Sequence, residues 1–243
     1  DENLRVSRWA ILDMLVEAGA DLTAQSEFSD WNLMTYASFF GDAEMVEKLR
    51  ELGLAESLEA LVYQRRFDDI RVRLGQNPHL LKERYRYGEN LLQLSIPLCD
   101  ESFARYLVKK GLSPLDLDNS GRDALHYYFS QNYSPPKLDI GVLRMLLEMG
   151  CDPNRVNEIQ KGRYSRSAIS VAALNGNKES LSLLVEYGAD INAKGKQGKS
   201  SLHWAVMNQN EQTTIALIEL GADVNAQTEK IEMPVHWGLT PLH

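Results

Sequence analysis

The chain has 243 residues, of which 44% are hydrophobic and 25% are charged, and its formal net charge is −8. This composition is that of a globular protein and excludes a disordered or collagen-like chain. The negative charge argues against a general nucleic-acid binder, and no apolar run approaches the ~18 residues of a membrane span. No signal peptide is visible at the start. Two cysteines, Cys99 and Cys151, are too few for a disulfide framework, so we expect a cytoplasmic protein.

A phrase that begins with glycine recurs along the chain, mostly at intervals of 33–39 residues. Apolar residues at helical spacing come before each copy, so the glycine suits the left-handed cap that ends a helix. Gly53 and Gly111 hold the same place with weaker followers. The four clear copies are Gly19-Ala20-Asp21-Leu22, Gly150-Cys151-Asp152-Pro153-Asn154, Gly188-Ala189-Asp190-Ile191-Asn192 and Gly221-Ala222-Asp223-Val224-Asn225.

A second phrase precedes each glycine by about two helical segments. Its copies are Asn32-Leu33-Met34-Thr35-Tyr36-Ala37-Ser38, Asp123-Ala124-Leu125-His126, Ser167-Ala168-Ile169-Ser170-Val171-Ala172-Ala173, Ser200-Ser201-Leu202-His203-Trp204-Ala205 and Thr240-Pro241-Leu242-His243. Together the two phrases resemble the ankyrin repeat, and the resemblance extends over essentially the whole chain.

The resemblance implies an all-α solenoid in which each unit has a helix, a turn, an antiparallel second helix and a β-hairpin finger. One unit cannot bury its apolar face alone, so stacked units supply the core. We predict a single array over residues 1–243, with units at about 1–25, 26–55, 56–80, 81–115, 116–154, 155–193, 194–226 and 227–243.

Several units depart from the repeat pattern. Arg65-Arg66 replaces the turn glycine of the third unit, Tyr133-Ser134-Pro135-Pro136 is inserted in the fifth, and residues 155–166 lengthen a finger. The first unit is expected to begin inside its own first helix, and the last stops inside its Thr-Pro-Leu-His phrase. Since neither end resembles a polar capping unit, we expect the chain to be part of a longer array or a larger protein.

The segment from Ala193 to Ser200 fits a loose phosphate-binding loop pattern. Such a loop needs a strand before it and a helix after it, whereas the preceding segment here is a predicted helix. We therefore prefer a solvated basic fingertip to a nucleotide site.

The histidines also have a structural reading. His126, His203 and His243 hold the last place of the second phrase, where the resemblance implies a bond to the loop backbone, so we predict no metal site. No hydrolase or metalloprotease motif is present. The prediction is a protein that is not an enzyme and holds no cofactor.

Exposed aromatic residues suggest one contact surface. Phe39, Phe40 and Tyr63 occupy the outward positions of two neighbouring units, and Met207 holds the same place in a later unit. Aromatic side chains are enriched at the energetic centres of interfaces, so we predict a contiguous patch. The alternative is that these rings are buried and repair imperfect stacking between irregular units.

Basic residues concentrate on the fingers, although residues 1–60 hold 13 acidic and 4 basic side chains. Such a row of cations would steer an acidic or extended segment of a protein partner. The alternative is ordinary solubility charge on exposed loops. The finger residues predicted to bind are Arg84, Arg86, Tyr87, Arg122, Arg163, Tyr164, Arg166, Lys194, Lys196 and Lys199.

The preferred functional prediction is a protein–protein interaction module that binds a protein partner on its concave face and basic fingers, with no nucleic acid as partner. The alternative is the recognition region of a larger enzyme, ubiquitin-ligase adaptor or host-directed effector. Some members of the family that the chain resembles are hydroxylated on a finger asparagine, and Asn154, Asn192 and Asn225 have the spacing. That spacing is nearly the repeat consensus itself, so we prefer a structural role for these asparagines.

Overall fold

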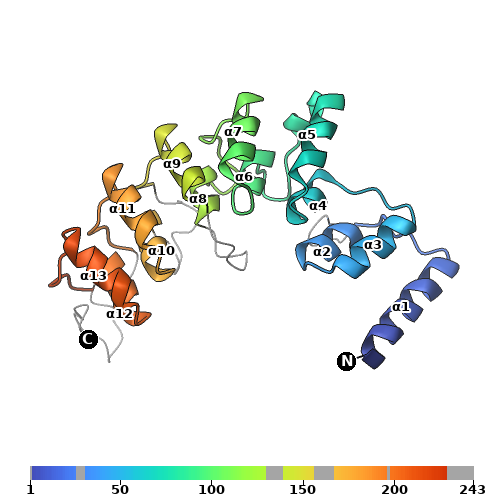
Figure 1. Ribbon diagram of the computed structural model, residues 1–243, viewed down its shortest axis with the longest axis horizontal. Helices are drawn as coiled ribbons and strands as arrows, with labels where there is room; N and C mark the ends of the chain where they lie inside the picture. Colours follow the sequence, from blue (N-terminus) through green and yellow to red (C-terminus); the bar gives the residue numbers. More distant parts are fainter. Residues whose placement is uncertain (1, 26–30, 130–138, 156–166, 196–197, 229–243) are drawn as a thin grey trace. The chain divides into compact units, whose positions relative to one another are not determined.

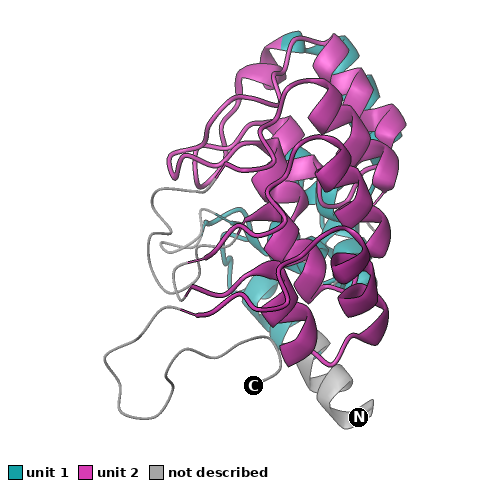
Figure 2. Cartoon of the chain, turned by 90° about the vertical axis from the view of Figure 1, so that its left-hand side faces the viewer, with its two compact units in different colours: residues 1–78 teal, residues 79–243 magenta. Residues whose placement is uncertain are grey.

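The structure is a computed structural model that describes residues 2–25, 31–129, 139–155, 167–195 and 198–228. The chain divides into two compact units, Asp1–Pro78 and His79–His243, called here unit 1 and unit 2 (Figure 2). The insertion at 133–136, most of the finger at 155–166 and nearly all of the last predicted repeat lie outside the described residues.

Unit 1 contains five α-helices in its described part. Within it α2 packs against α3 and α4, and α4 packs against α5 (Figure 1). The helices are α1 (Glu2–Glu17), α2 (Leu33–Phe39), α3 (Ala43–Glu51), α4 (Leu58–Tyr63) and α5 (Phe67–Gln76).

Unit 2 is a succession of helix pairs. The first helices of neighbouring pairs pack against each other, as α6 does with α8 and α10 does with α12 (Figure 1). The second helices also pack in succession, from α7 to α9, α11 and α13. The helices are the 3₁₀ turn η1 (Pro78–Lys82), α6 (Leu91–Ser95), α7 (Glu101–Lys109), α8 (Ala124–Tyr128), α9 (Ile140–Glu148), α10 (Ala168–Leu174), α11 (Lys178–Glu186), α12 (Ser201–Met207) and α13 (Glu211–Glu219).

The first predicted repeat differs from expectation. We expected it to begin inside a first helix, but residues 2–17 form one continuous helix, α1, that leads directly into the Gly19 phrase. Because this phrase follows the second helix in the other repeats, α1 corresponds to a second helix. Each predicted repeat from 26–55 to 194–226 contains two α-helices in the described part of the chain.

Polar residues begin most helices, as the sequence phrases require. The Asp42 side chain accepts from the Met45 N–H at 3.1 Å and begins α3. The Asp100 side chain accepts from the Phe103 N–H at 2.8 Å and begins α7. Each such bond satisfies an N–H that has no partner within its helix, which fixes where the helix starts.

The fingers are turns rather than strand hairpins, and no β-strand occurs among the described residues. Two backbone bonds close each of three fingers. In the first, the Tyr85 N–H donates to Glu89 O and the Gly88 N–H donates to Tyr85 O; the same pair of bonds joins Asp118 with Arg122 and Gly121, and Gly195 with Lys199 and Gly198. Two bonds around one turn do not extend into a ladder, so the expected hairpins are reduced to loops. Within unit 2 these loops project from the same side of the helices (Figure 2).

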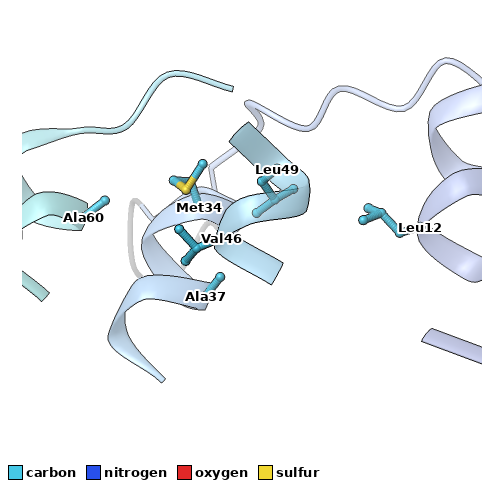
Figure 3. Close-up of a cluster of buried hydrophobic side chains, with 6 residues drawn as sticks. All are labelled: Leu12, Met34, Ala37, Val46, Leu49 and Ala60. Atoms are coloured by element: carbon cyan, nitrogen blue, oxygen red, sulfur yellow. The ribbon is translucent and has the colours of Figure 1, made fainter. Parts of the chain in front are cut away.

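The core of unit 1 joins α1 to the next two repeats. Met34, Leu49 and Ala60 have no exposed surface, and Leu12 of α1 is 4% exposed beside them (Figure 3). The small side chain of Ala37 lets neighbouring helices approach closely. This burial of apolar surface is the main stabilising contribution to the unit.

Four of the described turns between paired helices use left-handed backbone at one residue. Gly41 and Gly176 supply it with φ of 68° and 72°, and Arg65 and Gln209 adopt nearly the same conformation with φ of 57° and 54°. The predicted replacement of glycine by Arg65 therefore keeps the turn geometry at the cost of backbone strain.

Candidate interaction surfaces

Five aromatic side chains of unit 1 form a connected cluster, called here the aromatic cluster: Trp31, Tyr36, Phe39, Phe40 and Tyr63. The ring centroids of Phe39 and Tyr63 are 5.1 Å apart, and those of Phe39 and Phe40 are 5.2 Å apart, both edge to face. Trp31 lies 4.9 Å from Phe39 and 5.6 Å from Tyr63, and Tyr36 lies 6.5 Å from Phe40. The three predicted residues are therefore neighbours, and sequence reasoning missed Trp31 and Tyr36.

The cluster is partly packed and partly open. The Phe40 residue is 73% exposed, whereas the other four residues are half-buried. The Glu59 carboxylate lies at its edge, where Oε1 accepts from the Trp31 indole N–H at 2.8 Å and from the Tyr63 hydroxyl at 3.2 Å. The rings thus both fill the contact between α2 and α4 and present a surface.

A pocket of about 310 Å³ lies beside Tyr63, between the α2–α3 turn and the end of α4. Val46 contributes to its apolar wall, and Arg50 and Arg66 line it. Both guanidinium groups bind the Glu56 carboxylate, at 2.9 and 2.8 Å. Burial alone would raise the pKa of Glu56, but these cations hold the pKa below its usual range. Because its cations are already paired, this pocket is not built as an anion site.

Two finger loops of unit 2 lie side by side. The Asn119 N–H donates to the Tyr87 carbonyl at 2.8 Å, and the Asn90 side-chain amide donates to Asp116 at 3.2 Å. The approach is close, since a Cβ at Gly88 would lie 2.4 Å from the Asn119 side chain. The loop before α6 and the loop before α8 therefore form one connected surface.

Arg122 is a half-buried residue with partners inside the loop network rather than a free fingertip cation. Its side chain is only 17% exposed, its Nε donates to Asp118 at 2.7 Å, and its guanidinium donates to the Tyr127 hydroxyl at 2.9 Å. The hydroxyl of Tyr127 in turn donates to Asp118 at 2.8 Å. The guanidinium carbon also lies 5.4 Å from the centre of the Tyr87 ring.

Burial and hydrogen bonding shift the pKa values within this network. Burial opposes ionisation of Asp118, but bonds from the backbone N–H of Arg122, from Tyr127 and from the Arg122 side chain outweigh it and lower the pKa. Burial raises the pKa of the neighbouring carboxyl of Glu89, although Glu89 accepts from the Tyr87 N–H at 2.6 Å. The network therefore fixes both the fold of this loop and the position of Tyr87.

The exposed part of the two loops is called here the finger surface: Arg84, Arg86, Tyr87, Leu115 and Leu117. Tyr87 is 46% exposed, and the Arg86 guanidinium carbon lies 5.0 Å from the centre of its ring. Leu115 and Leu117 are each nearly half exposed. The side chain of Arg84 is 47% exposed and lies 3.7 Å from Asp116. Cations, an aromatic ring and apolar side chains thus share one surface.

The remaining predicted contact residues are spread along unit 2. The Lys194 ammonium donates to the Gln227 carbonyl at 3.0 Å, and the Lys199 ammonium lies 5.0 Å from the centre of the Trp204 ring. Met207 is 56% exposed at the end of α12. Arg163, Tyr164, Arg166 and Lys196 lie outside the described residues.

The segment from Ala193 to Ser200 connects helices, as in the preferred sequence interpretation. It follows α11 and precedes α12, and the bond from Gly198 N–H to Gly195 O at 2.8 Å closes its turn. A strand does not enter it, so the context of a phosphate-binding loop is missing.

The histidine and cysteine side chains have structural surroundings. Nδ1 of His203 lies 3.2 Å from the Ser200 N–H, and Nδ1 of His126 lies 2.7 Å from Asp123 Oδ1, so both rings cap their helices. Burial raises the pKa of Cys99 and Cys151 to about 12. Within the described ranges no group of His, Cys, Asp or Glu has the arrangement to hold a metal ion.

Finger asparagines connect neighbouring repeats. The Asn154 amide donates to Gly188 O and accepts from the Asp190 N–H, both at 2.8 Å. Asn192 accepts from the Asp223 N–H at 2.8 Å. These bonds give asparagine a structural reason to recur at this place.

Repeated helix pairs with loops on one side define a helical repeat protein. At the level of sequence, residues 137–228 match ankyrin repeats, in three copies. Among solved structures, the chain is similar to the ankyrin repeat domain of Bcl-3, described as a unique member of the IkappaB protein family. The two share 21% identity with a TM-score of 0.54, over 82% of this chain and 90% of that chain. No curated protein matches the chain.

Residues 137–228 are therefore ankyrin repeats, and the chain shares the fold of an ankyrin repeat domain. Ankyrin repeats indicate a protein–protein interaction module. Among the helices that the structure describes, none has the length and apolar character to cross a membrane.

Proposed function

We propose that the chain acts by binding a protein partner rather than by catalysis, and that the finger surface takes an acidic, extended segment of that partner. The observation that supports this most strongly is that the guanidinium carbons of Arg86 and Arg122 both lie near the Tyr87 ring, 5.0 and 5.4 Å from its centre. A site held in place before binding loses little conformational entropy when it binds. The cytoplasm as location stays a prediction.

The chemistry of the finger surface fits an acidic segment with apolar side chains. Arg86 makes no ion pair with any described residue, so its guanidinium is available to a carboxylate. Leu115 and Leu117 flank Asp116 on the adjoining loop and offer exposed apolar side chains. An extended segment places alternate side chains on the same face, so it can present both kinds of contact at once.

Binding of a labelled acidic peptide to the full chain, measured by fluorescence anisotropy at several salt concentrations, tests this proposal. We expect Arg86→Gln to weaken binding by at least about threefold and to flatten its salt dependence. Arg105→Gln is the matched control, since Arg105 is an equally exposed arginine of α7 that pairs with Glu101 and Glu148. Equal losses in the two variants would show that the peptide senses only total charge, and the proposed surface would be wrong.

A further inference from the structure

We propose that the aromatic cluster of unit 1 is a second binding site, separate from the finger surface and of the opposite charge preference. It takes a basic segment of a partner protein, in which an arginine side chain stacks on the exposed rings while Glu59 supplies negative charge. The sequence analysis had assigned these rings and the basic fingers to the same protein partner, with an acidic or extended segment aligned by the fingers.

The rings offer an exposed face. Phe40 is 73% exposed at the end of α2, and its ring lies nearly parallel to that of Tyr36, with 8° between the planes. The edge-to-face contact with Phe39 holds the Phe40 ring from one side. A cation over such a ring is attracted by the negative face of the π-system.

A carboxylate belongs to the same cluster. The Glu59 Oε1 atom accepts from the Trp31 indole and the Tyr63 hydroxyl, at 2.8 and 3.2 Å. These two bonds fix the position of the carboxylate beside the rings. Aromatic rings and a positioned carboxylate together favour a cationic ligand.

The charge of the whole unit favours the same ligand. Residues 1–78 hold 15 acidic and 8 basic side chains. This formal excess of negative charge steers a basic segment toward the unit. Four of the basic groups also pair with carboxylates of the same unit: Lys48 with Asp13, Arg50 with Glu56, Arg66 with Glu56, and Arg71 with Asp68.

Arginine suits this surface better than lysine. Its guanidinium is planar and weakly hydrated, so it stacks on a ring and still donates to a carboxylate. The ammonium of lysine is a compact, strongly hydrated charge with no flat face. The proposal therefore predicts a preference among basic peptides as well as a preference for positive charge.

The test uses three labelled peptides that are identical except that their charged positions are all arginine, all lysine or all glutamate. Fluorescence anisotropy with the full chain is expected to show tighter binding of the arginine peptide than of the lysine peptide at this site. Phe40→Ala and Glu59→Gln are each expected to weaken the arginine peptide by about fivefold. The amide introduced by Glu59→Gln would retain an acceptor for Trp31 and Tyr63, and Phe40 is exposed, so both variants are expected to fold, which circular dichroism checks.

Two further variants make the result decisive. Phe40→Leu keeps an apolar side chain and removes the ring, so it should bind the arginine peptide as weakly as Phe40→Ala. Asp68→Asn removes one negative charge from unit 1 at a side chain that is 92% exposed on α5, so it should have a smaller effect than Glu59→Gln. Full binding by Phe40→Leu, or equal losses in the two charge variants, would overturn the proposal.

Different variants and peptides test this inference and the proposed function, so one can be wrong without the other. Arg86→Gln should leave the arginine peptide unaffected, and Phe40→Ala should leave the glutamate peptide unaffected. If Phe40→Ala also loses binding of the glutamate peptide, the rings belong to the site that binds the acidic partner, and the proposal of a second site is wrong. Absence of arginine-peptide binding would also overturn it, whatever the finger surface does.

Discussion

Units 1 and 2 use the same repeat scaffold with different stabilising contacts. In unit 1 an apolar core lies around Met34 and Leu49, and the ion pairs range from the exposed pair of Arg71 and Asp68 to the pairing of two half-exposed arginines with the buried Glu56 carboxylate. In unit 2 the buried ion pair of Asp118 and Arg122 holds two loops together, and Tyr127 completes its hydrogen bonding.

The two units also differ in their charge balance. Residues 79–243 hold 19 acidic and 18 basic side chains, so unit 2 is nearly neutral, and its cations act locally through their placement on loops. Unit 1 carries a clear negative excess and presents rings instead. One fold thus supports two surfaces of opposite character, because helix packing leaves the exposed positions free to vary.

The largest expected effect comes from breaking the buried pair of unit 2. Asp118→Ala should lower the free energy of unfolding by about 3–5 kcal/mol, because it leaves the guanidinium of Arg122 buried without its carboxylate. Asp118→Asn keeps an acceptor for the turn N–H groups and should lose less. Urea denaturation gives the free energies.

The matched control in unit 1 is Asp68→Ala. Asp68 forms an ion pair with Arg71 but is almost fully exposed, so its removal should change stability little. If the two alanine variants are destabilised equally, the contrast between a buried and an exposed pair is wrong.

The next largest effect tests whether the units are stabilised independently. Leu49 in unit 1 and Leu107 in unit 2 are both fully buried, so replacement of either by alanine should cost about 2–5 kcal/mol. Hydrogen exchange should show the loss of protection mainly in the unit that carries the substitution. An equal loss in both units for either variant would mean that the chain unfolds as one cooperative body.

Sequence periodicity predicted the helix pairs because each phrase encodes a local requirement, such as the cap at Asp42 or Asp100. It also predicted that Phe39, Phe40 and Tyr63 would be neighbours. It missed Trp31, whose position depends on a bond to Glu59, 28 residues further along the chain. Such a contact is set by packing and has no local pattern.

The role of Arg122 shows a second limit. A fingertip arginine looks exposed in sequence, yet Asp118 lies four residues before it and Tyr127 five residues after it. That spacing was the available signal for an internal pair. Burial itself could not be predicted, because it depends on the neighbouring loop that carries Tyr87.

A smaller effect comes from the turns. Arg65 in unit 1 and Gln209 in unit 2 have left-handed backbone, so replacement of either by glycine should raise the free energy of unfolding by about 0.5–1 kcal/mol. Gly41→Ala should lower it by about 1 kcal/mol, since a Cβ there meets nothing within 4 Å and only the backbone conformation opposes it. Thermal and urea unfolding check all three variants. If Arg65→Gly is destabilised, the inference that the backbone of Arg65 is strained is wrong.

The smallest expected effect concerns Glu89 and depends on pH. Burial raises the pKa of Glu89 in the folded state, so its contribution to stability is complete below the ordinary value of about 4.3 and is lost as pH rises through the raised pKa. Glu89→Gln does not titrate and keeps an acceptor for the Tyr87 N–H. The stability of this variant relative to the natural chain should therefore increase between pH 4 and pH 7.

The comparison must be made as a difference between the two proteins. Asp118 has a lowered pKa, so it removes stability as pH falls through that value, in the opposite direction to Glu89. Both proteins retain Asp118, and its contribution cancels in the difference. Urea unfolding at several pH values gives the two curves. Parallel curves would mean that Glu89 titrates as it does in the unfolded chain, and that the loop network tolerates its charge at no cost to unit 2.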